Sequence, residues 1–320
     1  MRHSVKLFII ALSLTFFSCN QLDDTLEVDA TTASNLKAKS ANFNVNFQYK
    51  SSIIVGGEGA SEISAYDAKT KKLFVVNVES HQISVFSISN IDSPVEEASI
   101  SINMGSPNSV AVSKGLLAIA VEASPKQDPG VILVYDTSTM ALLNSYQVGA
   151  LPDMVTFSPN GQYIVSANEG EPSDDYTNDP EGSISIIEVI TGHVTTLNFQ
   201  GFASQQADLE ANDFRVFGPN ATLAQDIEPE YVAISDDSNI AWVTLQENNG
   251  IAKVNLKSKQ IEAIYPLGFK DYDMLGNSID PSDKDDDKVL NNWPVYGIYM
   301  PDAIEYLKVN GIDFVITANE

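Results

Sequence analysis

Nine acidic residues occupy matching places in five similar stretches of the sequence. In each stretch a glutamate follows an apolar run. In four of them an acid also opens the segment before that run, and Asn108 takes this place in the remaining stretch. The glutamates are Glu79, Glu122, Glu169, Glu247 and Glu320, and the opening acids are Glu62, Asp153, Glu230 and Asp302. Because solubility does not require a matched register, the pattern points to a shared acidic site.

Carboxylates gathered in one site repel one another, so protons or cations must offset their charge. Two carboxylates about 6 Å apart repel each other by about 3 kcal/mol at an effective dielectric constant of about 20. The acids must therefore hold protons, with raised pKa values, or bind cations. Basic partners are scarce, since Arg215 is the only arginine after Arg2. Oxygen ligands without thiolates or a histidine cluster favour a hard cation, and we expect Ca²⁺.

A second acidic stretch runs from Asp271 to Asp287. Asp280, Asp283 and Asp285 are candidate ligands there, although the run lacks the spacing and central glycine of an EF-hand loop. The alternative for these loop acids is a solvated surface that keeps the protein soluble.

Known catalytic motifs are missing from the sequence. It contains no G-x-S-x-G, H-E-x-x-H, C-x-x-C or phosphate-binding glycine loop. His81 follows one of the repeated glutamates, and we interpret it as a turn residue rather than a base. An alternative to a binding protein is a metal-dependent phosphoesterase, in which the acidic site holds cations that bind a phosphate ester and activate water.

The elements that position these acids form a repeated unit. Segments 61–66, 107–112, 152–157, 229–234 and 301–306 alternate as strands do, and most lead through a turn to a more apolar strand, at 73–78, 116–121, 163–167, 240–245 and 313–318. Third strands follow at 82–86, 130–135, 182–187 and 250–254, and a fourth at 261–267. Four antiparallel strands recurring about every 45 residues predict an all-β fold, a β-propeller with about four and a half blades, rather than a two-layer sandwich.

This fold would gather the acids on one rim. In an up-and-down blade, the start of the first strand and the end of the second lie at the same end of the sheet. Three insertions, at 170–182, 200–228 and 270–294, are assigned to that side as well. We therefore expect the net charge of −25, from 43 acidic and 18 basic residues, to be concentrated at one end of the domain.

The composition excludes several classes of protein. A polyanion of this kind repels phosphate backbones and anionic lipids, so we expect no nucleic-acid partner. A hydrophobic fraction of 43% is too high for a disordered acidic chain. The expected partner is an unknown surface ligand or protein.

The amino terminus predicts export. Residues 1–19 combine a short basic head with an apolar run and end at Cys19, the only cysteine, in a pattern that resembles a lipoprotein signal peptide in which this thiol is lipidated. Residues 20–42 are predicted to be a flexible tether and residues 43–320 the propeller domain. The chain is thus expected to be an outer-membrane or cell-surface lipoprotein of a bacterium, touching the membrane only through its lipid.

The fifth unit stops after its second strand. Such a unit exposes an unpaired strand edge, which closed propellers avoid. We therefore expect this sequence to be a fragment of a longer protein that lacks its C-terminal blades, with the strand-like segment 43–55 completing the last blade of the whole molecule.

Several strings together resemble the choice-of-anchor I family. They include Ser166-Ala167-Asn168-Glu169-Gly170-Glu171-Pro172, Glu228-Pro229-Glu230-Tyr231-Val232-Ala233-Ile234-Ser235 and Asn292-Trp293-Pro294-Val295-Tyr296-Gly297. The family includes bacterial surface proteins and is similar to the mesenchyme-specific cell surface glycoprotein of echinoderms. The resemblance implies a secreted or surface β-propeller. Some members carry an alkaline phosphatase label, and propeller phytases use calcium in a comparable acidic channel, but a fold does not fix a function.

Overall fold

Antiparallel strands make up almost all of the regular structure. The computed structural model describes residues 47–286 and 288–320, and residues 50–320 form one compact unit. The first sheet contains β1 (Ser64–Asp67), β2 (Lys72–Asn77), β3 (Gln82–Ser87) and β4 (Val95–Ser101), and the second β5 (Ser106–Ser113), β6 (Leu116–Glu122), β7 (Pro129–Asp136) and β8 (Leu142–Ala150). The third contains β9 (Pro152–Phe157), β10 (Tyr163–Asn168), β11 (Ser183–Glu188) and β12 (Val194–Asn198), and the fourth β13 (Pro229–Ile234), β14 (Ile240–Leu245), β15 (Gly250–Asn255) and β16 (Gln260–Pro266).

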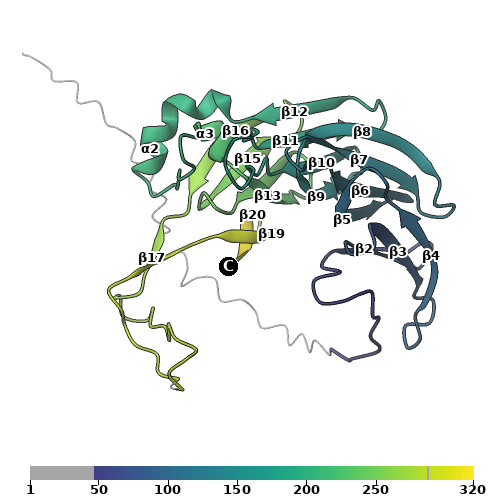
Figure 1. Ribbon diagram of the computed structural model, residues 1–320, viewed down its shortest axis with the longest axis horizontal. Coiled ribbons are helices and arrows are strands. Elements are labelled where there is room, and N and C mark those ends of the chain that lie inside the picture. The colour runs from purple at the N-terminus through teal and green to yellow at the C-terminus, as the bar shows by residue number, and fades with distance from the viewer. Residues whose placement is uncertain (1–46, 287) are drawn as a thin grey trace, which may run out of the picture. The chain divides into compact units, whose positions relative to one another are not determined.

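Each of these four sheets follows the chain order, with every strand antiparallel to the next (Figure 1). Two strand pairs follow, β17 (Phe269–Asp271) with β18 (Tyr296–Ile298) and β19 (Pro301–Val309) with β20 (Ile312–Asn319). The prediction of an all-β fold of repeated four-stranded units is confirmed. Its strand boundaries agree closely, except that β1 begins at Ser64 rather than at residue 61.

The core lies between consecutive sheets. One cluster joins the first and second sheets, a second joins the second and third, a third joins the third and fourth, and a fourth joins the fourth sheet to β19. In β6, Leu117 and Ile119 pack toward the first sheet, whereas Ala118 and Ala120 pack toward the third. Burial on both faces explains why the second strands are uniformly apolar instead of alternating.

Recurring turns fix the register of the strands. Ser158 accepts a hydrogen bond from the Tyr163 amide at 3.0 Å, and Ser235 accepts one from the Ile240 amide at the same distance. In the first of these turns Gly161 has a φ of +69°, a conformation that glycine adopts without strain. The same serine-based turn therefore joins the first two strands of both the third and the fourth sheets.

Glycine and proline meet where one sheet packs on the next. A Cβ added to Gly130 would lie 2.4 Å from Pro152 Cδ, and one added to Gly182 would lie 2.7 Å from Pro229 Cδ. Each proline opens the first strand of the following sheet. This contact explains why glycine and proline recur at these positions, because only glycine allows the two chain segments to approach so closely.

Helical turns occur in the insertion between the third and fourth sheets. They are η1 (Gln200–Gln205), α2 (Gln206–Glu210) and α3 (Leu223–Asp226). Phe199, Phe214 and Ile227 from this insertion are buried in the core cluster that joins the two sheets. None of the helices among the described residues is long and apolar enough to cross a membrane.

The amino-terminal predictions are tested only in part. The signal segment 1–19 with Cys19, the tether 20–42 and residues 43–46 lie outside the described residues. Residues 47–55 form no strand, and Phe47 and Ile54 are 93% and 91% exposed. The prediction that segment 43–55 completes the last blade concerns the whole molecule, and it stays a prediction.

Candidate metal centre

Bulges set the direction of the acids that open the first strands. In β9 the pairing passes from Pro152 opposite Asn168 to Met154 opposite Ala167, so Asp153 is the extra residue. The pairing of β13 with β14 shifts in the same way between Pro229 and Val232, around Glu230. A bulge turns a side chain out of the regular alternation of a strand, which is why such features occur beside functional sites. The repeated proline and acid therefore mark a bulge as well as a strand start.

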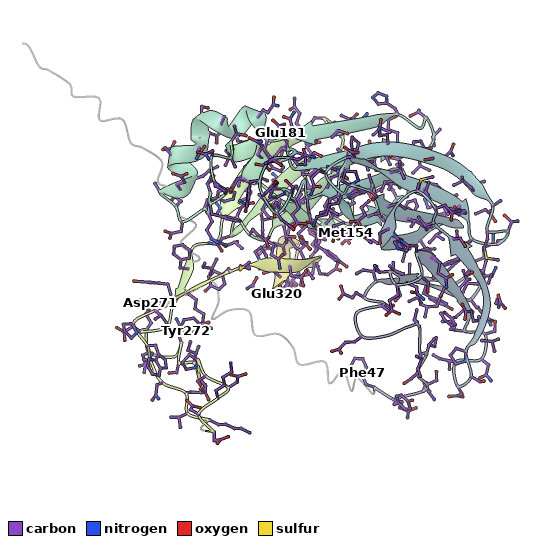
Figure 2. All side chains as sticks on the ribbon, in the orientation of Figure 1. Phe47, Met154, Glu181, Asp271, Tyr272 and Glu320 are labelled. Atoms are coloured by element: carbon purple, nitrogen blue, oxygen red, sulfur yellow. The ribbon has the colours of Figure 1, made fainter. Side chains whose placement is uncertain are left out.

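Three carboxylates converge at these bulges. Asp153 lies in β9, Glu169 directly follows β10, and Glu230 lies in β13. One oxygen from each lies within 4.8 Å of the other two, and all three side chains are partly buried. Figure 2 shows the side chains of this region, with Met154, the neighbour of Asp153, labelled. Within residues 47–286 and 288–320, this acidic triad is a group whose oxygens lie close enough together to hold a metal ion.

Burial and mutual repulsion shift the acidic triad toward its protonated form. Burial, followed by the charges of Asp153 and Glu230, raises the pKa of Glu169 to about 10. Burial and the charge of Asp153 raise the pKa of Glu230 to about 8. Burial, followed by the charge of Glu122, raises the pKa of Asp153 to about 6. At neutral pH two of the three carboxyls therefore hold a proton unless a cation replaces it.

Acids from the other sheets surround the triad. Burial and then the charge of Glu247 raise the pKa of Glu228 to about 8. Burial, then the charges of Glu320 and Glu62, raise the pKa of Asp302. Glu62 precedes β1 and Asp302 lies in β19, so an acid of the first repeated unit acts on an acid of the last.

A comparison with known families agrees with this architecture. Residues 62–320 match the choice-of-anchor I domain. This chain belongs to the choice-of-anchor I domain family. The match begins at Glu62 and spans the four sheets and both strand pairs. No curated protein matches the chain.

Two basic residues adjoin the acids in this choice-of-anchor I domain. Lys126 forms an ion pair with Glu171. Burial alone would lower the pKa of Lys126, but this hydrogen bond and the charges of Glu171, Glu169 and Glu122 raise it. Arg215 donates from Nη1 to the Glu247 carbonyl at 2.7 Å and stacks on the Phe217 ring at 4.8 Å. The role of Lys126 is not apparent from the sequence, because its partner Glu171 lies 45 residues away in the chain.

A buried amide holds the helical insertion of the domain against the acids. Asn248 is fully buried and donates to the Asp226 carboxylate at 2.9 Å and to the Arg215 carbonyl at 3.1 Å. Its own oxygen accepts from the Glu228 amide at 3.1 Å. Asp226 in turn accepts from the Phe217 amide at 2.9 Å. This network fixes Glu228 beside the start of β13, where its charge adds to burial and to the charge of Asp153 in raising the pKa of Glu230.

The remaining predicted ligands lie outside the acidic triad. Glu79 is exposed and accepts a hydrogen bond from the Gly57 amide at 3.0 Å. Glu320 accepts from Gln246 at 3.3 Å, and Glu122 accepts from Asn108 at 3.4 Å. Of the second acidic stretch, Asp280 is half-buried and Asp283 and Asp285 are exposed, and none of the three belongs to the triad. Ligation by these residues stays a prediction, as it does for Glu62, Glu247 and Asp302.

Proposed function

We propose that this chain is an exported, lipid-anchored β-propeller that binds Ca²⁺ at the acidic triad and an unidentified surface ligand or protein through the surrounding acidic rim. The observation that carries the proposal is the convergence of Asp153, Glu169 and Glu230 from two different sheets. Three carboxylates brought together by bulges lower the stability of the protein unless a cation offsets them.

The separation of the oxygens suits this ion. Ca²⁺ binds oxygen ligands at about 2.3–2.6 Å, so two oxygens on opposite sides of the ion lie about 5 Å apart. The three oxygens of the triad lie within 4.8 Å of one another, so one such ion could contact all of them. The ligand set is oxygen only, which is the chemistry that Ca²⁺ prefers, and water can complete its coordination.

Two observations support a ring of blades around the site. The first strands of consecutive units contact one another, β1 with β5, β5 with β9, β9 with β13 and β13 with β19. Glu62 and Asp302, from the first and last units, are also near enough for one charge to raise the pKa of the other residue. Innermost first strands and a shared rim are the arrangement of propeller blades about a central channel.

Ca²⁺ is expected to raise the melting temperature of the full chain. Saturation at a hundred times the Kd adds about 2.7 kcal/mol to the free energy of unfolding, which corresponds to a rise of about 5–10 °C in a domain of this size. The measurement is a thermal melt in Ca²⁺, in Mg²⁺ and in chelator. Ca²⁺ should have the larger effect, because Mg²⁺ demands stricter geometry and gives up its water reluctantly.

A matched pair of variants ties this rise to the triad. Glu169→Gln combined with Glu230→Gln should remove the Ca²⁺ effect, whereas Glu96→Gln combined with Glu97→Gln, on the exposed side of β4, should keep it. An equal shift in both double variants would place the ion elsewhere. Hydrolysis of a phosphomonoester by wild type but not by the triad variant would instead support the phosphoesterase alternative.

Export and anchoring have a separate test. Replacing the only thiol by Cys19→Ser should move the protein from the membrane fraction to the soluble fraction of a bacterial host and abolish incorporation of labelled palmitate, because the lipid supplies the membrane affinity. Ser18→Ala serves as the control and should leave the protein in the membrane fraction. A Cys19→Ser protein that stays in the membrane fraction would contradict the lipid anchor.

A further inference from the structure

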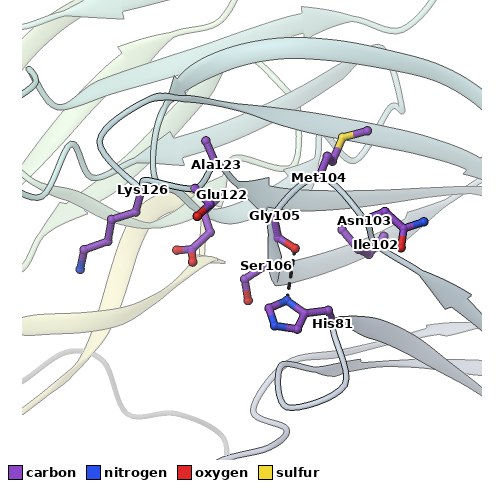
Figure 3. Close-up of a pocket in the computed structure, with 10 residues that line it drawn as sticks. His81, Ile102, Asn103, Met104, Gly105, Ser106, Glu122, Ala123 and Lys126 are labelled. Atoms are coloured by element: carbon purple, nitrogen blue, oxygen red, sulfur yellow. Dashed lines mark hydrogen bonds between the residues drawn. The ribbon is translucent and has the colours of Figure 1, made fainter.

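A pocket separate from the acidic triad lies where the first and second sheets meet (Figure 3). Its volume is about 690 Å³, within the usual range for small-molecule sites. The polar residues that line it come from the turn after β2, from the link between β4 and β5 with the start of β5, and from the end of β6 with the residues after it. They include His81, Asn103, Ser106, Glu122, Ser124 and Lys126. Figure 3 shows Lys126, Glu122 and Ser106 reaching toward the same side, with the His81 ring next to Ser106.

The backbone holds these groups in place. A Cβ added to Gly105 would lie 1.6 Å from the Glu122 carbonyl oxygen, so only glycine lets the chain before β5 pass this close to the end of β6. His81 has a φ of 47°, in the left-handed region that few residues other than glycine adopt. That conformation directs its ring to the Gly105 carbonyl, 3.3 Å from Nδ1.

The hydrogen bonds assign a role to each group. A carbonyl oxygen only accepts, so Nδ1 of His81 carries the proton in this contact and Nε2 of the neutral ring is an acceptor. The Glu122 carboxylate is an acceptor as well, and Asn108 supplies one weak donor to it, at 3.4 Å. The Ser106 hydroxyl can donate or accept, and the Lys126 ammonium donates. The pocket thus presents acceptors and donors side by side.

Charge selects among the possible ligands. Lys126 is already paired with Glu171, so an anion entering the pocket would meet the Glu122 carboxylate without an unpaired cation in the lining. A neutral molecule with neighbouring hydroxyls avoids this repulsion, because each hydroxyl can donate to Glu122 or His81 and accept from Ser106 or Lys126.

We propose that this pocket binds a neutral saccharide. The binding rests on the pocket's own groups, so it does not require a cation at the acidic triad.

The test uses the full chain and an array of neutral saccharides, namely glucose, galactose, mannose and N-acetylglucosamine with their common disaccharides. The best binder is then titrated by calorimetry. Binding should persist in chelator. Glu122→Gln and His81→Asn should each weaken it at least tenfold, because a hydrogen bond to a charged or well-oriented acceptor is lost. Asparagine suits position 81 because it tolerates a positive φ.

His193→Asn is the control, since His193 is also exposed in a turn but lies outside the pocket. It should bind as wild type does. Melting temperatures of all variants check folding, and the exposed His81→Asn variant keeps the test valid if Glu122→Gln does not fold. The proposal is overturned if no saccharide on the array binds, if both pocket variants bind as wild type does, or if chelator alone abolishes binding.

Discussion

Without divalent cations, the Glu169→Gln protein is expected to melt at least about 5 °C above wild type at pH 9 and at the same temperature at pH 4. The folded pKa of Glu169 is about 10, far above the value of 4.5 for an unperturbed glutamate. A raised pKa stabilises the folded state fully below the unfolded pKa, and this stabilisation is lost as the pH rises toward the folded pKa. For each proton that the folded state binds and the unfolded state does not, the free energy of unfolding falls by about 1.4 kcal/mol per unit rise in pH between these two pKa values.

Three other acids with raised pKa values also lower the stability as the pH rises, each over a narrower pH range. These ranges end near pH 8 for Glu230 and Glu228 and near pH 6 for Asp153. The melting temperature of metal-free wild type should therefore fall as the pH rises from 5 to 9. Glutamine keeps the shape of Glu169 but has no proton to lose, so its variant should have a shallower profile.

Thermal melts in chelator from pH 4 to pH 9 measure this effect. The control is Glu96→Gln, which removes one exposed charge from the outer strand β4 of the first sheet. This control measures how much stability the protein gains when any one negative charge is removed from a net charge of −25. A wild-type melting temperature that does not fall with pH, or a control that gains as much as Glu169→Gln at pH 9, would contradict the assignment.

Gly182→Ala is expected to lower the free energy of unfolding by about 3 kcal/mol or more, a fall of about 10 °C in melting temperature. Its Cβ would lie 1.9 Å from the Ile227 carbonyl oxygen, 2.7 Å from Pro229 Cδ and 2.8 Å from the Glu169 carbonyl oxygen. None of these atoms belongs to a flexible side chain that could move away. Backbone at the junction of the third and fourth sheets must therefore shift, next to Glu169 and Glu230.

Gly201→Ala is the matched control, because nothing lies within 4 Å of a Cβ at that position. It lies in η1, where alanine is at least as favourable as glycine. Thermal melts of both variants measure the difference, and the Gly182→Ala protein should also lose its response to Ca²⁺. If the two variants melt within about 1 °C of each other, the close contact between the sheets does not constrain the fold.

The repeated strands were predictable because their pattern has one physical cause. Strands buried on both faces are largely apolar, and four of the five first strands carry an acid at or near the start. The turns at Ser158 and Ser235 have residue types that specify them locally. These features depend on near neighbours in the chain, so the sequence alone is sufficient to predict them.

The candidate site was predictable as a set of acids but not as a geometry. That Asp153 is the extra residue of a bulge depends on how β9 pairs with β10, which no single strand encodes. The choice of three carboxylates among nine depends on the distance between two sheets.

The triad takes two carboxylates from the third unit and one, Glu230, from the fourth, 61 residues further along the chain than Glu169. A bound ion would therefore act as a cross-link between neighbouring repeats. In a repeat protein, contacts between neighbours set how far unfolding of one unit spreads to the next. Such a cross-link would make these two sheets exchange their amide hydrogens as one unit, and it would let them resist a pulling force together.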